Sequence, residues 1–348
     1  MDKQPWIKSK YFDLSFIIGP SFVPVIIVIF LHSFSLLPDE TNLIDWLLLV
    51  VFIDVAHVWS TLYKTYLNPG TLKRNQDLFF YVPLICWVLG AMVYSIKALF
   101  FWKLLAYLAV FHFIRQQYGF FMIYTKDTIY KDKWHQKIDK LIIYQTTIVP
   151  MIHWHVHYPK NFKWFISNDF FKLDFPIIEN LSWIIYGITI ILYLVKEKNN
   201  GQFNLPKNLF LLGTALSWFL GIVIFNGDWA FTMINIVSHG IPYIALIWSN
   251  SLDKQTIQTE SMALKFIWNK NNIKRLAIFI CLILTIAYIE EGLWDSLVWK
   301  DHSVLFPFLK DIPKMESKNV FAWLIPLLSV PQAAHYVLDG FIWKSKFH

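Results

Sequence analysis

Apolar residues occur in long runs that are separated by short polar segments. Most runs have about the 20 residues that a helix needs to cross the hydrocarbon core of a bilayer. Ten runs are candidate spans: 13–37, 44–63, 78–96, 99–124, 138–153, 178–195, 208–225, 228–248, 276–294 and 320–343. The fifth and sixth are the weakest, because they are short and have Lys140, Gln145 and Glu179 near or within them. The pattern predicts an all-α, polytopic membrane bundle of about eight to ten transmembrane helices.

Composition and charge agree with a membrane protein. Hydrophobic residues make up 56% of the chain and charged residues 16%, against about 25% charged residues in soluble domains. No polar stretch is long enough for a separate domain, so residues 1–348 are expected to form a single multi-span domain. The net charge of +7 comes without a basic, aromatic-rich stripe, so nucleic acid is not an expected partner. If the ten spans cross in turn, the segments on the same side of the membrane as the N-terminus hold more than twice as many Lys and Arg residues as those on the other side. This bias predicts that both termini are cytosolic.

Four histidines lie deep within the candidate spans, and each has a polar partner three or four residues away. The pairs are Asp54–His57, His112–Gln116, Asn235–His239 and His335–Asp339. Residues at this spacing are neighbours on one face of a helix. All four spans are predicted to run towards the cytosol, and the eight residues lie at similar distances from the cytosolic ends. They are therefore expected at a common depth in the cytosolic half of the bundle.

Imidazole and carboxylate ligands at one depth indicate a transition-metal site. Together they suit iron, zinc or manganese, and we expect iron, with zinc as the alternative. The predicted ligands are His57, His112, His239 and His335, and Asp54 and Asp339 are expected to bind the metal or to orient the histidines. The alternative is that each histidine makes one interhelical hydrogen bond and has no further role.

Arg115, Gln116 and Asn235 are the candidate catalytic residues beside these histidines. Arg115 lies inside a span, three residues after His112. A buried guanidinium is suited to a carboxylate or a phosphate, so Arg115 is expected either to form a salt bridge with Asp54 or Asp339 or to anchor an anionic substrate. We favour the salt bridge, because an unpaired carboxylate at that depth would be costly.

A second group of histidines occurs in the run HWHVHYP, at the external end of the fifth candidate span. His153 and His157 would share a helical face if the helix continues that far, and they are second-tier metal ligands or a proton entrance. The alternative is a belt of aromatic and histidine side chains at the membrane interface, which Trp154 and Tyr158 would suit.

The arrangement of His57, His112, His239 and His335 resembles that of integral-membrane histidine-motif non-haem iron enzymes. These comprise the desaturase and hydroxylase group and the bacterial membrane carotene-cleavage dioxygenases. The desaturases carry HxxHH boxes, which this chain lacks, and four intramembrane histidines look closer to the carotene-cleaving type. The resemblance implies a metal-dependent oxidoreductase that uses iron.

The sequence therefore predicts a metalloenzyme, an oxygenase, hydroxylase or desaturase, that acts on a lipid-soluble substrate inside the bilayer. Its expected partners are the lipid bilayer, a hydrophobic small molecule and an electron-donor protein. The rival hypothesis is a proton-coupled transporter or channel that uses the same His and Asp residues as a relay. A relay would stagger these residues across the bilayer in two related halves, whereas the sequence groups them at one depth and shows no internal repeat.

Overall fold

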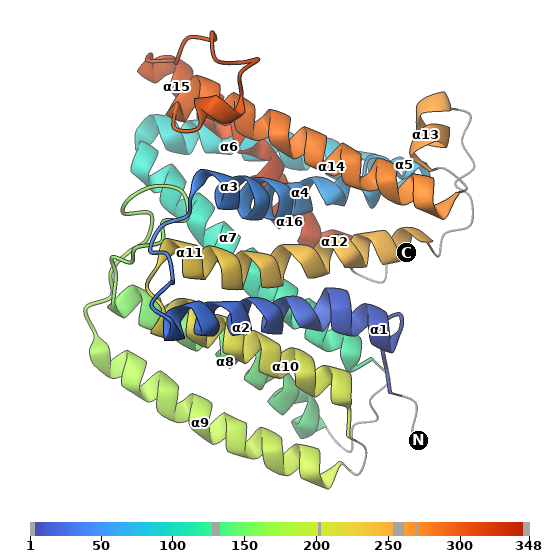
Figure 1. Ribbon diagram of the computed structural model, residues 1–348, viewed down its shortest axis with the longest axis vertical. Helices are drawn as coiled ribbons and strands as arrows, with labels where there is room; N and C mark the ends of the chain where they lie inside the picture. Colours follow the sequence, from blue (N-terminus) through green and yellow to red (C-terminus); the bar gives the residue numbers. More distant parts are fainter. Residues whose placement is uncertain (1–3, 127–132, 201–202, 253–260, 269–270, 344–348) are drawn as a thin grey trace. The chain divides into compact units, whose positions relative to one another are not determined.

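The computed structural model describes residues 4–126, 133–200, 203–252, 261–268 and 271–343, and every regular element within them is helical (Figure 1). This confirms the all-α prediction. Among the described residues, nine helical stretches are long and apolar enough to cross a membrane. They are Lys10–Ser33, Leu43–Tyr63, Gln76–Ile96, Ala98–Tyr124, Pro176–Asn199, Leu205–Ile224, Asp228–Asn250, Asn272–Trp299 and Lys318–Ile342. The fold is thus compatible with a multi-pass membrane protein.

The two weakest candidate spans have different outcomes. The sixth corresponds to α9 (Pro176–Asn199), which is one of the nine apolar helices. The fifth corresponds to α8 (Lys133–Val156), which is long enough to span but is not among the nine. Lysines and Asp139 in its first two turns lower its mean hydropathy, so a membrane crossing at 138–153 stays a prediction.

The chain divides into two compact units, each made of two separate stretches of sequence. Unit 1 contains Met1–Thr41 and Val110–Pro242, and unit 2 contains Asn42–Ala109 and Tyr243–His348. Two of the boundaries fall inside helices, α7 (Ala98–Tyr124) and α12 (Val237–Leu252). Because no linker marks these boundaries in the sequence, the expectation of a single domain stays a prediction.

Unit 1 is a set of packed helices in which α9 lies along α8, and α10 packs against both α2 and α8 (Figure 1). Besides α8, α9 and parts of α7 and α12, its elements are α1 (Lys10–Phe12), η1 (Asp13–Ile18), α2 (Gly19–Ser33), α10 (Leu205–Trp218), η4 (Phe219–Ile224), α11 (Asp228–Phe231) and η5 (Thr232–Ile236).

A buried charge cluster joins α8, α9 and α10. The Lys196 ammonium donates to Asp139, and the Lys207 ammonium donates to Glu197 Oε1 at 2.5 Å. None of the four side chains is more than 8% exposed. Two positive and two negative charges therefore balance one another where water does not reach, as buried ions require.

In unit 2, α15 and α16 pack against α6, and α14 packs against η2 and α4 (Figure 1). Besides the remaining parts of α7 and α12, its elements are α3 (Leu43–Asp45), η2 (Trp46–Val55), α4 (Ala56–Ser60), η3 (Thr61–Tyr63), α5 (Pro69–Arg74), α6 (Gln76–Ile96), α13 (Met262–Ile267), α14 (Asn272–Trp294), η6 (Asp295–Trp299), η7 (Ser303–Leu305), α15 (Lys318–Leu328) and α16 (Val330–Ile342).

Candidate functional site

Three buried aromatic rings of unit 2 pack edge to face around one point. They are His57 on α4, His335 on α16 and Tyr243 on α12, and none is more than 2% exposed. The ring centroids of the two histidines are 5.0 Å apart, and those of Tyr243 lie 5.7 Å from His57 and 5.2 Å from His335. A ring nitrogen of His57 lies within 4.8 Å of one of His335, a separation that a shared metal ion could bridge after small side-chain movements.

The Nδ1 atom of each of these histidines faces a polar partner. His57 Nδ1 is 3.4 Å from an oxygen of Asp54, one turn earlier in the chain. His335 Nδ1 is 2.8 Å from Thr61 Oγ1. Histidines that bind metals usually have the other ring nitrogen held in this way by a carboxylate, carbonyl or other polar group. Nε2 is therefore the nitrogen that the His335 ring would offer to a metal, whereas the contact between His57 Nδ1 and Asp54 is at ion-pair distance.

Hydrogen bonds connect His335 to Asp339 through two hydroxyl groups. Thr61 Oγ1 is 3.1 Å from the Tyr243 hydroxyl, which donates to Asp339 Oδ1 at 2.7 Å. Trp343 Nε1 donates to the same oxygen at 2.6 Å. An ionised carboxylate only accepts, so Tyr243 donates to Asp339, Thr61 to Tyr243, and His335 Nδ1 to Thr61. This hydrogen-bond network assigns the Nδ1–H tautomer to His335 and leaves the lone pair on Nε2.

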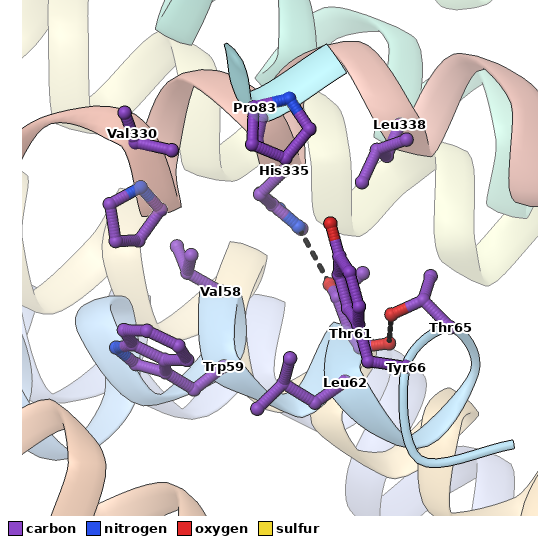
Figure 2. Close-up of a pocket in the computed structure, with 12 residues that line it drawn as sticks. Val58, Trp59, Thr61, Leu62, Thr65, Tyr66, Pro83, Val330, His335 and Leu338 are labelled. Carbon is purple, nitrogen blue, oxygen red and sulfur yellow. Dashed lines mark hydrogen bonds between the residues drawn. The ribbon is translucent and has the colours of Figure 1, made fainter. Parts of the chain in front are cut away.

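An apolar pocket of about 270 Å³ opens beside His335 (Figure 2). Its lining residues are Val58, Trp59, Thr61, Leu62, Thr65, Tyr66, Pro83, Val330, Pro331, Ala334, His335 and Leu338. His335 contributes the only imidazole among them, and no lining residue has a carboxyl group. The polar hydroxyls are used locally, since Thr65 donates to the Thr61 carbonyl and Tyr66 to the Phe79 carbonyl. The pocket thus places an imidazole against a hydrocarbon-like surface.

A buried carboxylate fixes one wall of this pocket. Glu290, on α14, is 6% exposed. It accepts from Trp59 Nε1 at 2.5 Å and from Gln332 Nε2 at 2.9 Å. The two donors belong to different helical segments, so the Glu290 side chain holds the Trp59 ring in place on the pocket wall.

The other two predicted histidines pair within unit 1. The rings of His112, on α7, and His239, on α12, have centroids 5.0 Å apart. Phe113 stacks on His239 with centroids 3.5 Å apart. Gln116 Nε2 donates to the backbone carbonyl of His239 at 2.7 Å. Among the described residues, Gln116 Oε1 is buried and has no hydrogen-bond partner.

Asn235 is buried against the backbone of a neighbouring helix. A Cβ atom on Gly221 would lie 2.1 Å from Asn235 Nδ2, so a larger residue at position 221 would force the Asn235 side chain to move. Within the described part of the chain, neither polar atom of the Asn235 amide has a hydrogen-bond partner. Two buried amides with unused hydrogen-bonding capacity therefore lie in the unit that holds His112 and His239.

Two of the polar partners lie in π-helical segments that come directly before a histidine-bearing α-helix. Asp54 is in η2, which precedes α4 and His57, and Asn235 is in η5, which precedes α12 and His239. π-helical turns are rare and are frequent at functional sites. The run of apolar residues at these positions predicts regular α-helix and gives no sign of the π-helical segments.

Arg115 differs from the sequence-based expectation. Its side chain is exposed on α7, where the guanidinium donates to the Tyr144 hydroxyl and lies 4.9 Å from the Tyr118 ring centroid. The prediction of a buried guanidinium is therefore wrong. Arg115 lies about 60° around the helix axis from His112 and about 100° from Gln116. This rotation is enough to bring it to the edge of the buried face, where its side chain is exposed.

The predicted ligands thus fall into groups within each unit. His57, His335, Asp54 and Asp339 belong to unit 2, and His112 and His239 to unit 1. The second-tier residues His153 and His157 also lie in unit 1, where both imidazoles face Glu179. That all four histidines of the candidate spans bind one metal stays a prediction, as do the catalytic roles of Gln116 and Asn235.

Thr61 and Tyr243 are site residues that the pattern of paired polar residues did not single out. Thr61 follows His57 by four residues and Tyr243 follows His239 by four, so the spacing used to find Asp, Asn and Gln partners would also have found these hydroxyls. No protein-family model, no curated protein and no solved structure matches the chain. Its function is accordingly inferred from its own residues.

Proposed function

We propose that the chain is an integral-membrane metalloenzyme that acts on a lipid-soluble substrate beside His57 and His335. The observation that carries the proposal is that His335 belongs both to the histidine pair and to the pocket wall. Its ring packs against His57, and the same side chain lines the apolar pocket. A metal held by the two histidines would therefore lie next to a cavity suited to a hydrocarbon chain.

The residues around His57 and His335 fit a transition metal. Two imidazoles and a nearby carboxylate form the donor set used by non-haem iron oxygenases, and zinc hydrolases use a related one. Among the described residues, one oxygen of Asp54 is buried without a hydrogen-bond partner, 3.4 Å from His57 Nδ1. In this proposal Asp54 orients His57, and Thr61 orients His335. A bound iron would supply dioxygen activation for hydroxylation, desaturation or cleavage, and a bound zinc would supply an activated water.

The substrate class follows from the pocket. The volume of about 270 Å³ and the Val, Leu and Pro lining suit one segment of an acyl, sterol or isoprenoid chain. Trp59, held by Glu290, would fix the position of that chain. A lipid-soluble substrate could enter from the surrounding bilayer without a polar channel. If the metal is iron, an electron-donor protein would be a further partner.

Metal analysis of the purified full-length protein tests the proposal. The parent protein carries His157→Ala, so that the histidines beside Glu179 do not add a metal of their own. In this parent we expect about one equivalent of iron or zinc per chain, lost in His57→Ala and in His335→Ala and kept in the control His32→Ala, whose side chain is exposed.

His112→Ala and His239→Ala distinguish a four-histidine centre, in which they also lose the metal, from a site of His57 and His335 alone. Less than about a tenth of an equivalent in the parent would contradict a metalloenzyme.

The hydrogen-bonded path from His335 to Asp339 favours a second candidate function, a proton-coupled transporter or channel. Imidazole, two hydroxyls and a carboxylate in series form a chain along which a proton could move. Asp339→Asn separates the two functions. A relay predicts normal metal content and stability with lost proton uptake in liposomes, whereas the metalloenzyme predicts weaker metal retention.

A further inference from the structure

His153, His157 and Glu179 form a compact three-residue cluster in unit 1. His153 lies in the last turn of α8, His157 directly follows that helix, and Glu179 lies in the first turn of α9. One potential ligand atom from each residue lies within 4.8 Å of the other two. The cluster plays no part in the function proposed for His57 and His335.

Backbone geometry keeps the two imidazoles together. Although α8 ends at Val156, the His157 amide donates to the His153 carbonyl at 3.0 Å, so the helical spacing continues for one more residue. The two rings have centroids 4.1 Å apart. The expectation that His153 and His157 share a face is confirmed.

The two imidazoles contact different oxygens of one carboxylate. His153 Nδ1 is 2.6 Å from Glu179 Oε1, and His157 Nε2 is 3.1 Å from Glu179 Oε2. Two imidazole nitrogens and one carboxylate are the protein ligands of many zinc sites that keep an open fourth position. Ligand atoms around a tetrahedral zinc are about 3.3 Å apart when the bonds are 2.0–2.1 Å. The ligand atoms here lie within 4.8 Å of one another, so their separations would need to change by at most about 1.5 Å.

We propose that His153, His157 and Glu179 bind a zinc-class divalent cation that enters from the aqueous phase. The His157 side chain is 52% exposed, whereas His153 and Glu179 are 13% and 12% exposed. The cluster therefore has one open ligand and two that are held in place. Because its ligands come from α8 and α9, the cation would tie the ends of these two helices together and stabilise unit 1 when bound.

Lys160 supplies a charge that would weaken cation binding. Its positive charge disfavours a further positive charge at His153, and a positive charge on His157 has the same effect. Replacing it with a neutral side chain should tighten binding by about two- to fivefold, the range for one partly exposed charge. This variant changes no ligand, so it separates metal binding from a simple His–Glu ion pair.

Titration of the chelator-treated full chain with Zn²⁺ in detergent tests the proposal. The parent protein carries His335→Ala, so that the result does not depend on the function proposed above. We expect one zinc per chain with micromolar or tighter affinity, at least about tenfold weaker in Glu179→Gln and in His157→Ala. The control His32→Ala should bind as the parent does, and Lys160→Gln should bind more tightly.

The unfolding temperature gives a second readout. Zn²⁺ should raise it in the parent and in His32→Ala but not in Glu179→Gln. His157 is half exposed, so His157→Ala is expected to fold even if Glu179→Gln does not. Absence of zinc binding by the parent, or equal binding by the parent and His157→Ala, would overturn the proposal.

Discussion

Asp339 and His335 lie four residues apart on α16, yet the hydrogen-bonded path that joins them runs through Tyr243 and Thr61 on other segments. The carboxylate at one end sets the direction of every donor along the path. Asp339 therefore controls which ring nitrogen of His335 carries the proton without having to contact the ring itself. This relationship makes Thr61 the residue whose loss should disturb His335 most directly.

Thr61→Val should weaken metal retention by about 10–100-fold, the usual effect of losing a group that orients a ligand. Valine has nearly the shape of threonine but cannot accept from His335 Nδ1. Thr61→Ser keeps the hydroxyl and is the matched control, expected to retain metal as the wild type does. Metal content after dialysis against increasing chelator concentrations gives the comparison. Equal retention in Thr61→Val would show that Thr61 does not set the state of His335.

A bulky residue in the apolar pocket should block the substrate and leave the metal site intact. Val330 lines the pocket, and Val330→Trp would fill it. We expect at least about fivefold less labelling by a photoactivatable palmitate analogue, with unchanged metal content. The control is Val320→Trp, since Val320 is 42% exposed on α15 and does not line the pocket. Undiminished labelling of Val330→Trp would place the lipid elsewhere.

Asp139→Asn should strongly destabilise the protein. It leaves two lysines beside one carboxylate in the cluster that joins α8, α9 and α10. Breaking a buried pair in this way typically costs about 3–5 kcal/mol. Asp174→Asn is the control, because its 2.9 Å pair with Lys172 is exposed and should contribute almost nothing. Unfolding of both variants in mixed detergent micelles measures the difference, and equal stability would show that the buried cluster is not structural.

The side of the membrane on which each terminus lies depends on whether α8 crosses. Lys73→Cys and Lys265→Cys, introduced singly after Cys86 and Cys281 are replaced by alanine, report on the segments before α6 and before α14. If α8 crosses with the nine apolar helices, both cysteines should be protected from an impermeant maleimide outside the cell. Labelling of Lys265→Cys alone would mean that α8 does not cross, and the two termini would then lie on opposite sides.

The sequence by itself determined the helical class and the length of the apolar helices. It also determined which polar residue shares a helical face with each histidine. These properties are local, because run length and the spacing of three or four residues are read along one segment. The close approach of Asp54 to His57 was predictable for this reason. The same rule, extended to hydroxyl groups, would have singled out Thr61 and Tyr243 but not their partners.

Only the tertiary structure decided which segments supply the partners. It joined Thr61 to His335 and Tyr243 to Asp339, and it placed the Gln116 amide on the His239 carbonyl. It also turned Arg115 outward to Tyr144. Contacts of this kind depend on how helix surfaces interlock, which involves residues far apart in the chain. The sequence of one helix does not specify which residues of another helix will contact it. Depth and spacing therefore predicted candidate residues but not the contacts between them.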